Sequence, residues 1–448
     1  MRSVALRYLG ACGCAVVLSG CGARSGIEAG ELPAAQVGAV PACSDGAREE
    51  VCNGIDDDCD GEIDEDLPFE VIDGPIAVRT DEGRTDHGTD GDCTSCGWAW
   101  DPQLVMPGGE LGVVWYLGIY GSHEQPSGFF RRLSWELEPQ GVVSSLGPGF
   151  WMSTLGRGAT RQGAPVLTFV ERKNSRDWPS FALLGSGFRP SASVALEGCS
   201  VEDAGRGLLT VLLPGLVGCG IFGQLHTFVL DDDGRGVSSH IQHQLGLPGE
   251  TNTDSGGRSV AALNGDSGLV ALPLVDGAFD APDQLWTQRI SAQGAPLAEA
   301  LRQPLDGPKS LRLEGLFSAP NGYLLFGEDS GSGEWPHGRF VLPLGLDGRV
   351  NGELVHFDQG LADRDAVSVL RVGSGFVLAE STAHGLRVEQ LDQSGAILSD
   401  WQQDVPIYSA ASLLFAHGHL YLAFAEPPPR DGGENRVVVS RFSCKFLR

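Results

Sequence analysis

The densest group of chemically active side chains lies at residues 50–66, where the chain reads EVCNGIDDDCDGEIDED. Asp56, Asp58 and Asp60 alternate within it, and Gly61 follows directly. Carboxylates this close together repel one another unless a cation lies between them. Ca²⁺ takes about six to eight oxygen ligands in irregular geometry, so this pattern predicts a calcium site.

The spacing resembles that of an EF-hand loop over its first nine positions. The resemblance implies metal ligands at Asp56, Asp58, Asp60, the carbonyl of Glu62, and Asp64. At the twelfth position the chain has Leu67 instead of a bidentate Glu. Glu65 or Asp66 must therefore close the site, as in thrombospondin type 3-like or dockerin-like loops.

Cys52 and Cys59 bracket the first ligands, and a disulfide between them would fix a loop that is too small to hold its shape by packing. Residues 43–67 resemble the MopE-type metal-binding repeat of bacterial secreted proteins and lipoproteins through the core E-V-C-N-G-x-D-D-D-C-D-G. The resemblance implies metal binding, with Ca²⁺ as the expected cofactor, and an extracellular setting. The alternative is a solvated acidic linker.

Residues 1–21 have the organisation of an export signal. Arg2 and Arg7 precede an apolar stretch at residues 8–18, and LSGC ends the segment at Cys21. This ending resembles the lipobox of bacterial lipoproteins, which implies that Cys21 is the mature N-terminus and carries the lipid. A secreted protein cleaved nearby is the alternative. Residues 22–42 are rich in Gly, Ala and Pro and are expected to form a flexible tether.

The remaining cysteines and the net charge agree with export. The cysteines beyond position 21 are even in number, as expected for disulfides in an oxidising compartment: Cys43, Cys52, Cys59, Cys93, Cys96, Cys199, Cys219 and Cys444. The formal net charge is −27, which argues against a nucleic-acid partner because phosphates require a basic face.

Residues 68–448 are predicted to be mainly β. A glycine followed by a short apolar strand recurs about every 51 residues, which is the period of a β-propeller. These glycines are Gly112, Gly163, Gly207, Gly268, Gly322, Gly375 and Gly418. Hairpin turns are expected later in the units, near Gly141, Gly234, Gly294, Gly348 and Gly395. We predict seven blades, within a range of six to eight, and tandem β-sandwich domains are the alternative.

The apolar run after each repeat glycine is expected to form the inner strands, buried on both faces between blades. The last unit ends after its third strand, and Phe69–Val78 is expected to supply the fourth and close the ring. Cys199 and Cys219 flank the third glycine strand and are expected to bridge neighbouring strands of one blade. A second bridge, from Cys444 to Cys93 or Cys96, would lock the ring.

Two segments resemble the motifs of trypsin-like proteases. Asn264–Gly268 reads NGDSG, and Thr382-Ala383-His384 resembles the histidine motif. The family requires His before Ser and a second glycine where this chain has Leu269, so we interpret NGDSG as a turn that leads into a strand.

Other polar patterns have simpler interpretations. His240-x-x-His243 and His417-x-His419 are spaced as metal-binding pairs but have no third ligand in sequence. For the latter pair we expect one turn histidine and one packed histidine. Asp231–Asp233 is expected to form a hairpin turn, with a weak Ca²⁺ site as the alternative.

Two functions are compatible with these features. The first is a non-enzymatic, lipid-anchored protein of the cell envelope, at the outer membrane or facing the periplasm or surface. Its calcium module would stiffen the stalk, and its propeller would serve as a binding or adhesion scaffold for a protein or glycan. The second is a propeller enzyme, a glycan hydrolase or lyase, with carboxylates at the central channel. We favour the first, since no pair of acids recurs at the ends of the inner strands.

Overall fold

The computed structural model describes most of residues 71–442. The residues outside the description are 1–70, 79–96, 120–126, 149, 174–175, 200–208, 222–223, 232, 246–252, 256–258, 277–283, 306–310, 330–337, 360–366, 373–374, 383–384, 393–396, 404–410, 427–435 and 443–448. The described residues are nearly all in β-strands, with two single-turn 3₁₀ segments at Pro107–Gly109 and Ser186–Phe188 and no α-helix.

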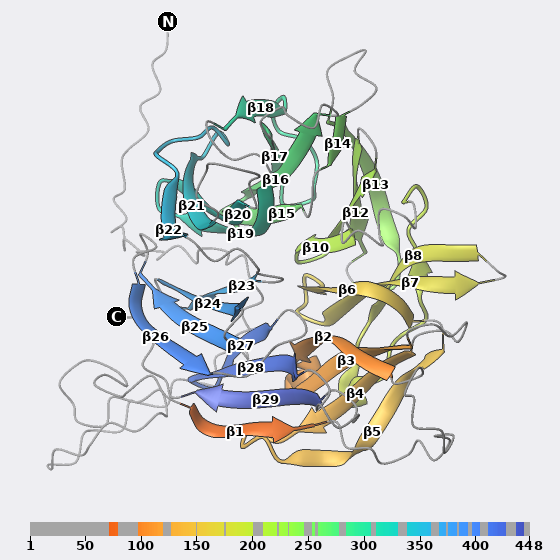
Figure 1. Ribbon diagram of the computed structural model, residues 1–448. Coiled ribbons are helices and arrows are strands. Elements are labelled where there is room, and N and C mark those ends of the chain that lie inside the picture. Colours follow the sequence, from red (N-terminus) through yellow and green to blue (C-terminus); the bar gives the residue numbers. More distant parts are fainter. Residues whose placement is uncertain are drawn as a thin grey trace, which may run out of the picture.

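The strands form seven antiparallel sheets arranged as the blades of a closed ring (Figure 1). Blade 1 contains β2 (Gly97–Val105), β3 (Gly112–Ile119), β4 (Ser127–Leu133) and β5 (Pro139–Pro148); blade 2 contains β6 (Phe150–Ala159), β7 (Pro165–Lys173), β8 (Arg176–Leu183) and β9 (Val194–Ala195); blade 3 contains β10 (Leu209–Leu213), β11 (Leu216–Ile221), β12 (Gln224–Leu230) and β13 (Val237–Gln244). Blade 4 contains β14 (Thr253–Ser255), β15 (Val260–Asn264), β16 (Ser267–Asp276), β17 (Gln284–Ser291) and β18 (Leu301–Pro304); blade 5 contains β19 (Leu311–Ala319), β20 (Gly322–Asp329), β21 (Gly338–Gly345) and β22 (Val355–Gln359). Blade 6 contains β23 (Val367–Val372), β24 (Gly375–Thr382), β25 (Gly385–Leu391) and β26 (Ile397–Gln403); blade 7 contains β27 (Ser412–Ala416), β28 (His419–Glu426), β29 (Arg436–Phe442) and β1 (Val71–Ala77). The predicted seven-bladed propeller is confirmed.

The ring closes through the two ends of the described chain. Strand β1 pairs antiparallel with β29, with Val71 opposite Phe442 and Ile76 opposite Val439. The backbone N–H of Val78 also donates to the carbonyl of Val437 at 2.9 Å. The N-terminal strand is therefore the outermost strand of blade 7, as the sequence predicts.

The strand that follows each repeat glycine is an inner, deeply buried strand, as predicted, but it is not always the first strand of its blade. In six of the seven units the apolar strand is the second one, as in β3 and β16, and in the third unit β10 is innermost while β11 is second. A second strand is covered on both faces by neighbouring blades and on both edges by its own sheet. Leu269, Val270, Ala271 and Leu272 of β16 are accordingly almost completely buried.

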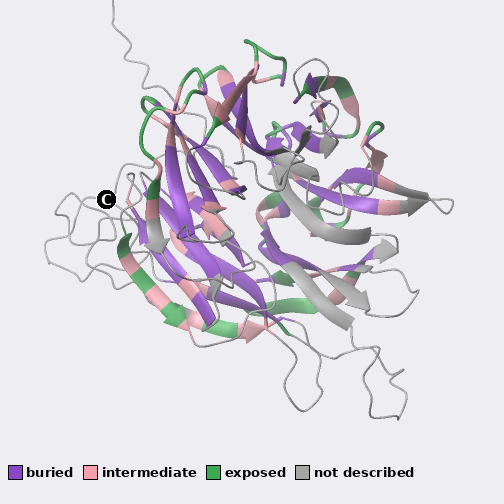
Figure 2. Cartoon of the chain, turned by 45° about the horizontal axis from the view of Figure 1, so that its top comes forward, coloured by how far each residue is buried: buried purple, intermediate pink, exposed green. Residues whose placement is uncertain are grey.

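The outermost strands are much less buried than the strands inside them. In blade 3, all but the first residue of β12 is buried, whereas the outermost strand β13 is largely exposed. Strand β26 of blade 6 likewise alternates between exposed and half-buried residues. Figure 2 shows buried residues along the inner strands and exposed residues along outer ones. The apolar core therefore consists of layers between adjacent blades.

One type of turn recurs in blades 3, 4 and 5 and packs each of them onto the preceding blade. Gly234, Gly294 and Gly348 occupy positive φ in these turns, at 67°, 79° and 83°. A Cβ on each would meet a side chain of the preceding blade at 2.5–2.8 Å. The turn expected near Gly141 is instead formed by Ser134–Glu138, and Gly141 lies within β5. The turn at Asp231–Asp233 is present as expected, with the Gly234 N–H donating to the Asp231 carbonyl at 2.9 Å.

Candidate functional site

The predicted calcium and lipid sites lie outside the described residues. This applies to Asp56, Asp58, Asp60, Glu62 and Asp64, to Cys21, and to the bracketing cysteines Cys52 and Cys59. Among the residues that the structure does describe, no three His, Cys, Asp or Glu side chains gather as metal ligands. No helix in the described part is long and apolar enough to cross a membrane.

A cluster of buried charged side chains lies between blades 5 and 6. Arg339 of β21 is 1% exposed, and Glu380 of β24 and Glu389 of β25 are fully buried. The Arg339 guanidinium donates Nη1–H to Glu389 Oε2 at 2.6 Å, and its Nη2 lies 2.8 Å from Glu380 Oε2. One buried arginine therefore joins two buried carboxylates across the blade junction.

A second arginine balances this charge. Arg387 of β25 lies 2.9 Å from Glu389 Oε1 and 3.5 Å from the more exposed Asp400 of β26. The four buried or half-buried groups Arg339, Arg387, Glu380 and Glu389 thus carry no net charge. Balance of this kind is required because an uncompensated ion in the interior costs several kcal/mol, of the order of 3–5.

The strand register explains how these side chains meet. Glu380 lies opposite Arg387, and Glu389 opposite Asp400, so all four share one face of blade 6. The same face carries Phe376 further along the sheet, where it packs on aromatic rings of blade 5. The charged groups therefore continue an apolar interblade layer, and the geometry suits them to holding two blades in register.

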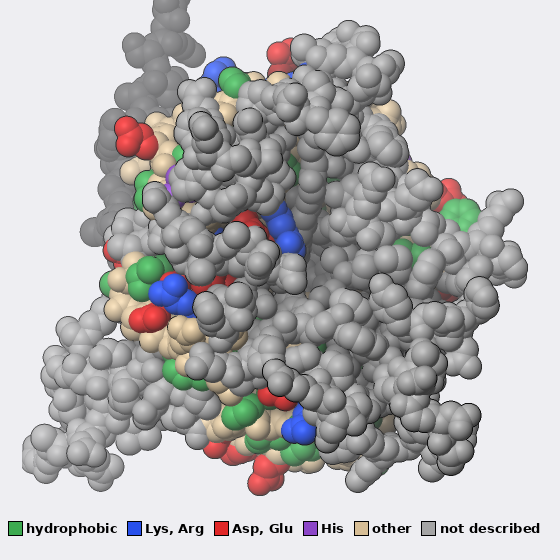
Figure 3. Space-filling model, viewed as in Figure 1, with side chains coloured by type: hydrophobic (Ala, Val, Ile, Leu, Met, Phe, Trp, Pro, Cys, Tyr) green, Lys and Arg blue, Asp and Glu red, His purple; other side chains and the backbone are tan. Residues whose placement is uncertain are grey.

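The innermost strand of blade 5 also carries charge. Arg312 and Glu314 of β19 form an ion pair at 3.0 Å, with Arg312 half-exposed. Arg371 of β23 donates to the Ser318 carbonyl at 2.6 Å, which links the inner strands of blades 5 and 6. Figure 3 shows basic and acidic side chains side by side near the middle of the face in view.

The structure separates the predicted pair His240 and His243. They lie on opposite faces of β13, because a spacing of three residues reverses the face of a strand. His243 is buried, its Nε2 lies 2.9 Å from Thr227 Oγ1, and its ring meets that of Trp286. Burial, with a smaller contribution from the charge of His226, lowers the pKa of His243 to about 4.

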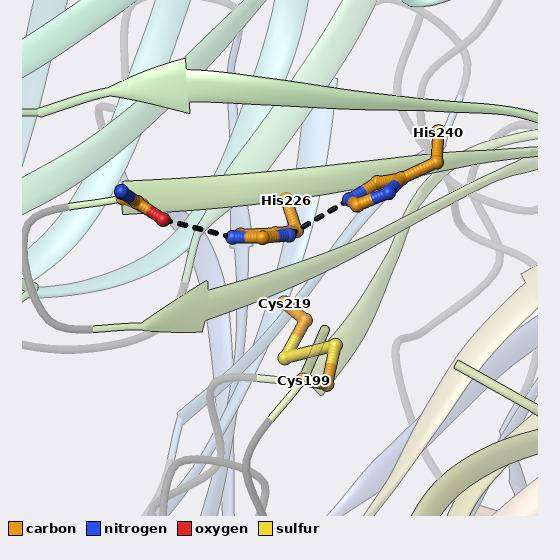
Figure 4. Close-up of a disulfide and its surroundings, with 5 residues drawn as sticks. Cys199, Cys219, His226 and His240 are labelled. Carbon is orange, nitrogen blue, oxygen red and sulfur yellow. Dashed lines mark hydrogen bonds between the residues drawn. A yellow bond between two sulfur atoms is a disulfide. The ribbon is translucent and has the colours of Figure 1, made fainter. Parts of the chain in front are cut away.

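His240 instead meets His226 of β12, a residue that the sequence analysis did not select. His226 Nδ1 lies 2.7 Å from His240 Nε2 (Figure 4). Burial, and then the neighbouring His240, lower the pKa of His226. The pairing could not be read from sequence spacing because it depends on the register between two strands.

The other predicted histidine pair takes the expected arrangement. His417 is a turn residue with φ of 50°, and its ring centroid lies 4.1 Å from that of Trp135. His419 begins β28, is half-buried and meets the edge of Tyr421. Burial raises the pKa of Tyr421 to about 12, and its hydroxyl donates to the Trp135 carbonyl.

The protease-like motif is a hairpin turn, as predicted. Asn264 pairs with Ser267 across the β15–β16 turn, with Gly265 at φ of 65°. The Asn264 amide donates to the carbonyls of Ala319 and Gly322 at 3.1 and 3.2 Å, and so joins this turn to the next blade. Residues 383–384 of the histidine-like motif lie outside the described residues.

Cys199 and Cys219 form a disulfide, with their Cα atoms 6.0 Å apart. The predicted partners are therefore correct, but the predicted location within one blade is not. Cys199 follows the last strand of blade 2, and Cys219 lies on β11 of blade 3, so the bridge joins two blades (Figure 4). Cys43, Cys93, Cys96 and Cys444 lie outside the described residues.

No protein-family model and no curated protein matches the chain. Among solved structures the chain is similar to a prolyl endopeptidase, with 11% identity and a TM-score of 0.48, over 77% of this chain and 47% of that one. It is similar to the sialidase of Trypanosoma rangeli, with 8% identity and a TM-score of 0.39, over 77% of this chain and 55% of the sialidase. It is also similar to the α-L-arabinanase of Penicillium chrysogenum, with 11% identity and a TM-score of 0.40, over 78% of this chain and 94% of the arabinanase. The chain thus spans about half the length of the first two. Similarities at this level assign no activity to it.

Proposed function

We propose that the chain is an exported, lipid-anchored calcium-binding protein whose propeller is a binding scaffold for a protein or glycan. The observation that supports this best is the ring closure by β1. The acidic segment, residues 43–67, precedes this strand by only three residues. The proposed module and anchor would therefore join the propeller at the outermost strand of blade 7, at the rim of the ring (Figure 1).

Strand β1 is well suited to carry the load of a tether. It hydrogen-bonds along β29, and Asp73 forms an ion pair with Arg441 of that strand. Arg441 Nη1 also donates to the Trp135 carbonyl at 3.1 Å, which joins the closing strand to blade 1. A pull on the N-terminal segment would be shared between two blades.

Anchoring is tested by membrane fractionation of cells that express the chain. The wild type is expected in the membrane fraction with acyl chains on Cys21, and Cys21→Ser is expected to leave an uncleaved or mislocalised precursor, since lipid supplies the affinity. A wild-type protein without acyl modification, as judged by mass spectrometry, would reject the anchor.

The scaffold function is tested with a glycan array and with envelope proteins immobilised on beads, each probed with the propeller-containing chain. Reversible retention without change to the bound molecule supports a scaffold. Release of shortened glycans would instead establish the alternative, a glycan hydrolase or lyase. An acid on an innermost strand could serve a hydrolase, but Glu314 of β19 is already paired with Arg312. We therefore test binding before hydrolysis.

A further inference from the structure

We propose that His226 and His240 form a binding site for a borderline divalent metal ion, with Zn²⁺ as the expected ligand. The site is separate from the acidic segment at residues 43–67. It lies on blade 3, between the third strand and the outermost strand of the sheet. It uses imidazole nitrogens where the acidic segment would use carboxylate oxygens.

The two rings are aligned so that one nitrogen of each faces the same point. His226 Nδ1 and His240 Nε2 are 2.7 Å apart. The ring centroids are 4.9 Å apart and the ring planes differ by only 25°, so the rings lie end to end in nearly one plane. The in-plane directions of both nitrogens therefore point into the space between them, where Figure 4 marks their hydrogen bond.

The hydrogen bond on the other side of His226 fixes its tautomer. Gln224 Oε1 lies 3.2 Å from His226 Nε2. If this amide oxygen accepts the Nε2 proton, the lone pair of neutral His226 is on Nδ1, facing His240. A metal-bound histidine characteristically donates its second N–H in this way, because the contact orients the ring and increases its basicity. Gln224 is thus a positioning residue for the proposed ligand.

Binding of a metal ion between the two nitrogens requires a small movement of His240. Zn²⁺ binds imidazole nitrogen at about 2.0–2.1 Å with tetrahedral angles, which requires the two nitrogens to separate by roughly 0.6 Å and the rings to tilt so that both nitrogens point at the ion. His226 is buried, whereas His240 is exposed on β13, so the adjustment falls to His240, whose ring would slide over that of Phe228. The Nε2 proton of a neutral His240 moves to its Nδ1, and solvent supplies the remaining ligands.

The neighbouring backbone has room for the two rings because residue 198 is glycine. A Cβ on Gly198 would lie 3.1 Å from His226 Nδ1 and 3.5 Å from His240 Cε1. The adjacent Cys199 is held by its disulfide to Cys219, and Cys219 lies directly opposite His226 in the register. The disulfide therefore keeps this turn beside the pair.

The test is calorimetric titration of Zn²⁺ into the mature chain in excess Ca²⁺, so that any oxygen-rich site is already filled. The wild type is expected to bind one Zn²⁺ that His226→Ala and His240→Ala each abolish. Gln224→Leu is expected to weaken binding about tenfold, as loss of such a supporting contact does. His243→Gln is the matched control, since His243 lies on the opposite face of the same strand, and it is expected to retain full affinity.

His240 is exposed on β13 and its ring covers Phe228, so His240→Ala disturbs the core less than substitution of the buried His226 does. Co²⁺ absorption supplies a second measurement, because nitrogen ligation changes its visible spectrum and that change should vanish in the same two variants. Equal Zn²⁺ affinity in the wild type and His240→Ala would overturn the proposal. So would loss of binding in His243→Gln with retention in His226→Ala.

Discussion

At the scale of single residues, the buried ion pairs between blades 5 and 6 are the feature most sensitive to substitution. Arg339 makes close contacts with Glu380 and Glu389 where water has little access. Arg339→Met removes the cation that two buried carboxylates share and leaves one negative charge unbalanced, so we expect it to lower the free energy of unfolding by about 3–5 kcal/mol. Urea denaturation of the wild type and of Arg339→Met measures this difference in the free energy of unfolding. Arg235→Met removes an exposed ion pair with Asp233 and is expected to change stability by less than about 1 kcal/mol.

A double variant distinguishes charge from packing at this site. In Arg339→Met/Glu380→Leu, Glu389 keeps its partner Arg387 at 2.9 Å, so the charges balance again. We expect the double variant to recover most of the lost stability. A double variant that is as unstable as Arg339→Met alone would mean that the shape of the arginine matters more than its charge.

His243 makes the stability of the propeller depend on pH. Its pKa is about 4 in the fold, against an ordinary value of 6.5, so the unfolded chain binds a proton more readily. The stabilisation is complete above pH 6.5 and is lost as the pH falls towards 4. Between pH 7 and pH 5 the wild type should lose about 2 kcal/mol more than His243→Gln. Equal losses in urea denaturation at the two pH values would contradict the burial of a neutral imidazole.

The sequence analysis singled out His243 but not the buried ion-pair residues Arg339, Glu380 and Glu389. The charged positions of blade 6 are visible in AES and RVEQ, where acids and a base interrupt apolar strands. Their partner Arg339 lies 50 positions before Glu389, and that separation is set by the packing of two blades. The pairing of His226 with His240 likewise depends on strand register.

At the scale of the elements, the hairpin turns carry much of the contact between blades. Gly348 and Gly163 have nearly the same positive φ, 83° and 84°. A Cβ on Gly348 would lie 2.8 Å from the buried Leu269 of blade 4, whereas a Cβ on Gly163 would meet nothing within 4 Å. The two glycines therefore form a matched pair for substitution.

We expect Gly163→Ala to cost about 1 kcal/mol, from backbone strain alone. Gly348→Ala should cost a further 1–3 kcal/mol or so, because the methyl group overpacks the blade junction. Thermal unfolding of the two variants measures the difference. Equal destabilisation would show that the turn of blade 5 does not depend on close contact with blade 4.

The sequence predicted the number of units and the closing strand, because a 51-residue recurrence and a missing fourth strand are both visible in it. It did not predict the position of each apolar strand within its blade. Hydrophobicity reports how deeply a strand is buried, and in a propeller the second strand is buried more completely than the first. The disulfide partners were predicted correctly, but their assignment to one blade was wrong because Cys199 lies between the last strand of blade 2 and the first strand of blade 3.

At the scale of the whole molecule, a closed seven-bladed ring follows a strongly acidic segment. The chain carries a net charge of −27, and much of the local repulsion in residues 50–66 would be relieved by a bound cation. Because β1 begins close after this segment, binding of Ca²⁺ would stiffen the connection between the proposed anchor and the rim of the ring.

Calorimetric titration of Ca²⁺ into the mature chain tests the central claim most directly. We predict binding in the range of about 10⁻⁴–10⁻³ M that is typical of extracellular calcium modules. Asp58→Ala and Asp60→Ala should each abolish it, while Asp347→Asn, in an exposed propeller turn, should leave it unchanged. No heat with Ca²⁺ at millimolar concentration, or the same heat in Asp58→Ala and Asp60→Ala as in the wild type, would contradict a calcium-binding protein.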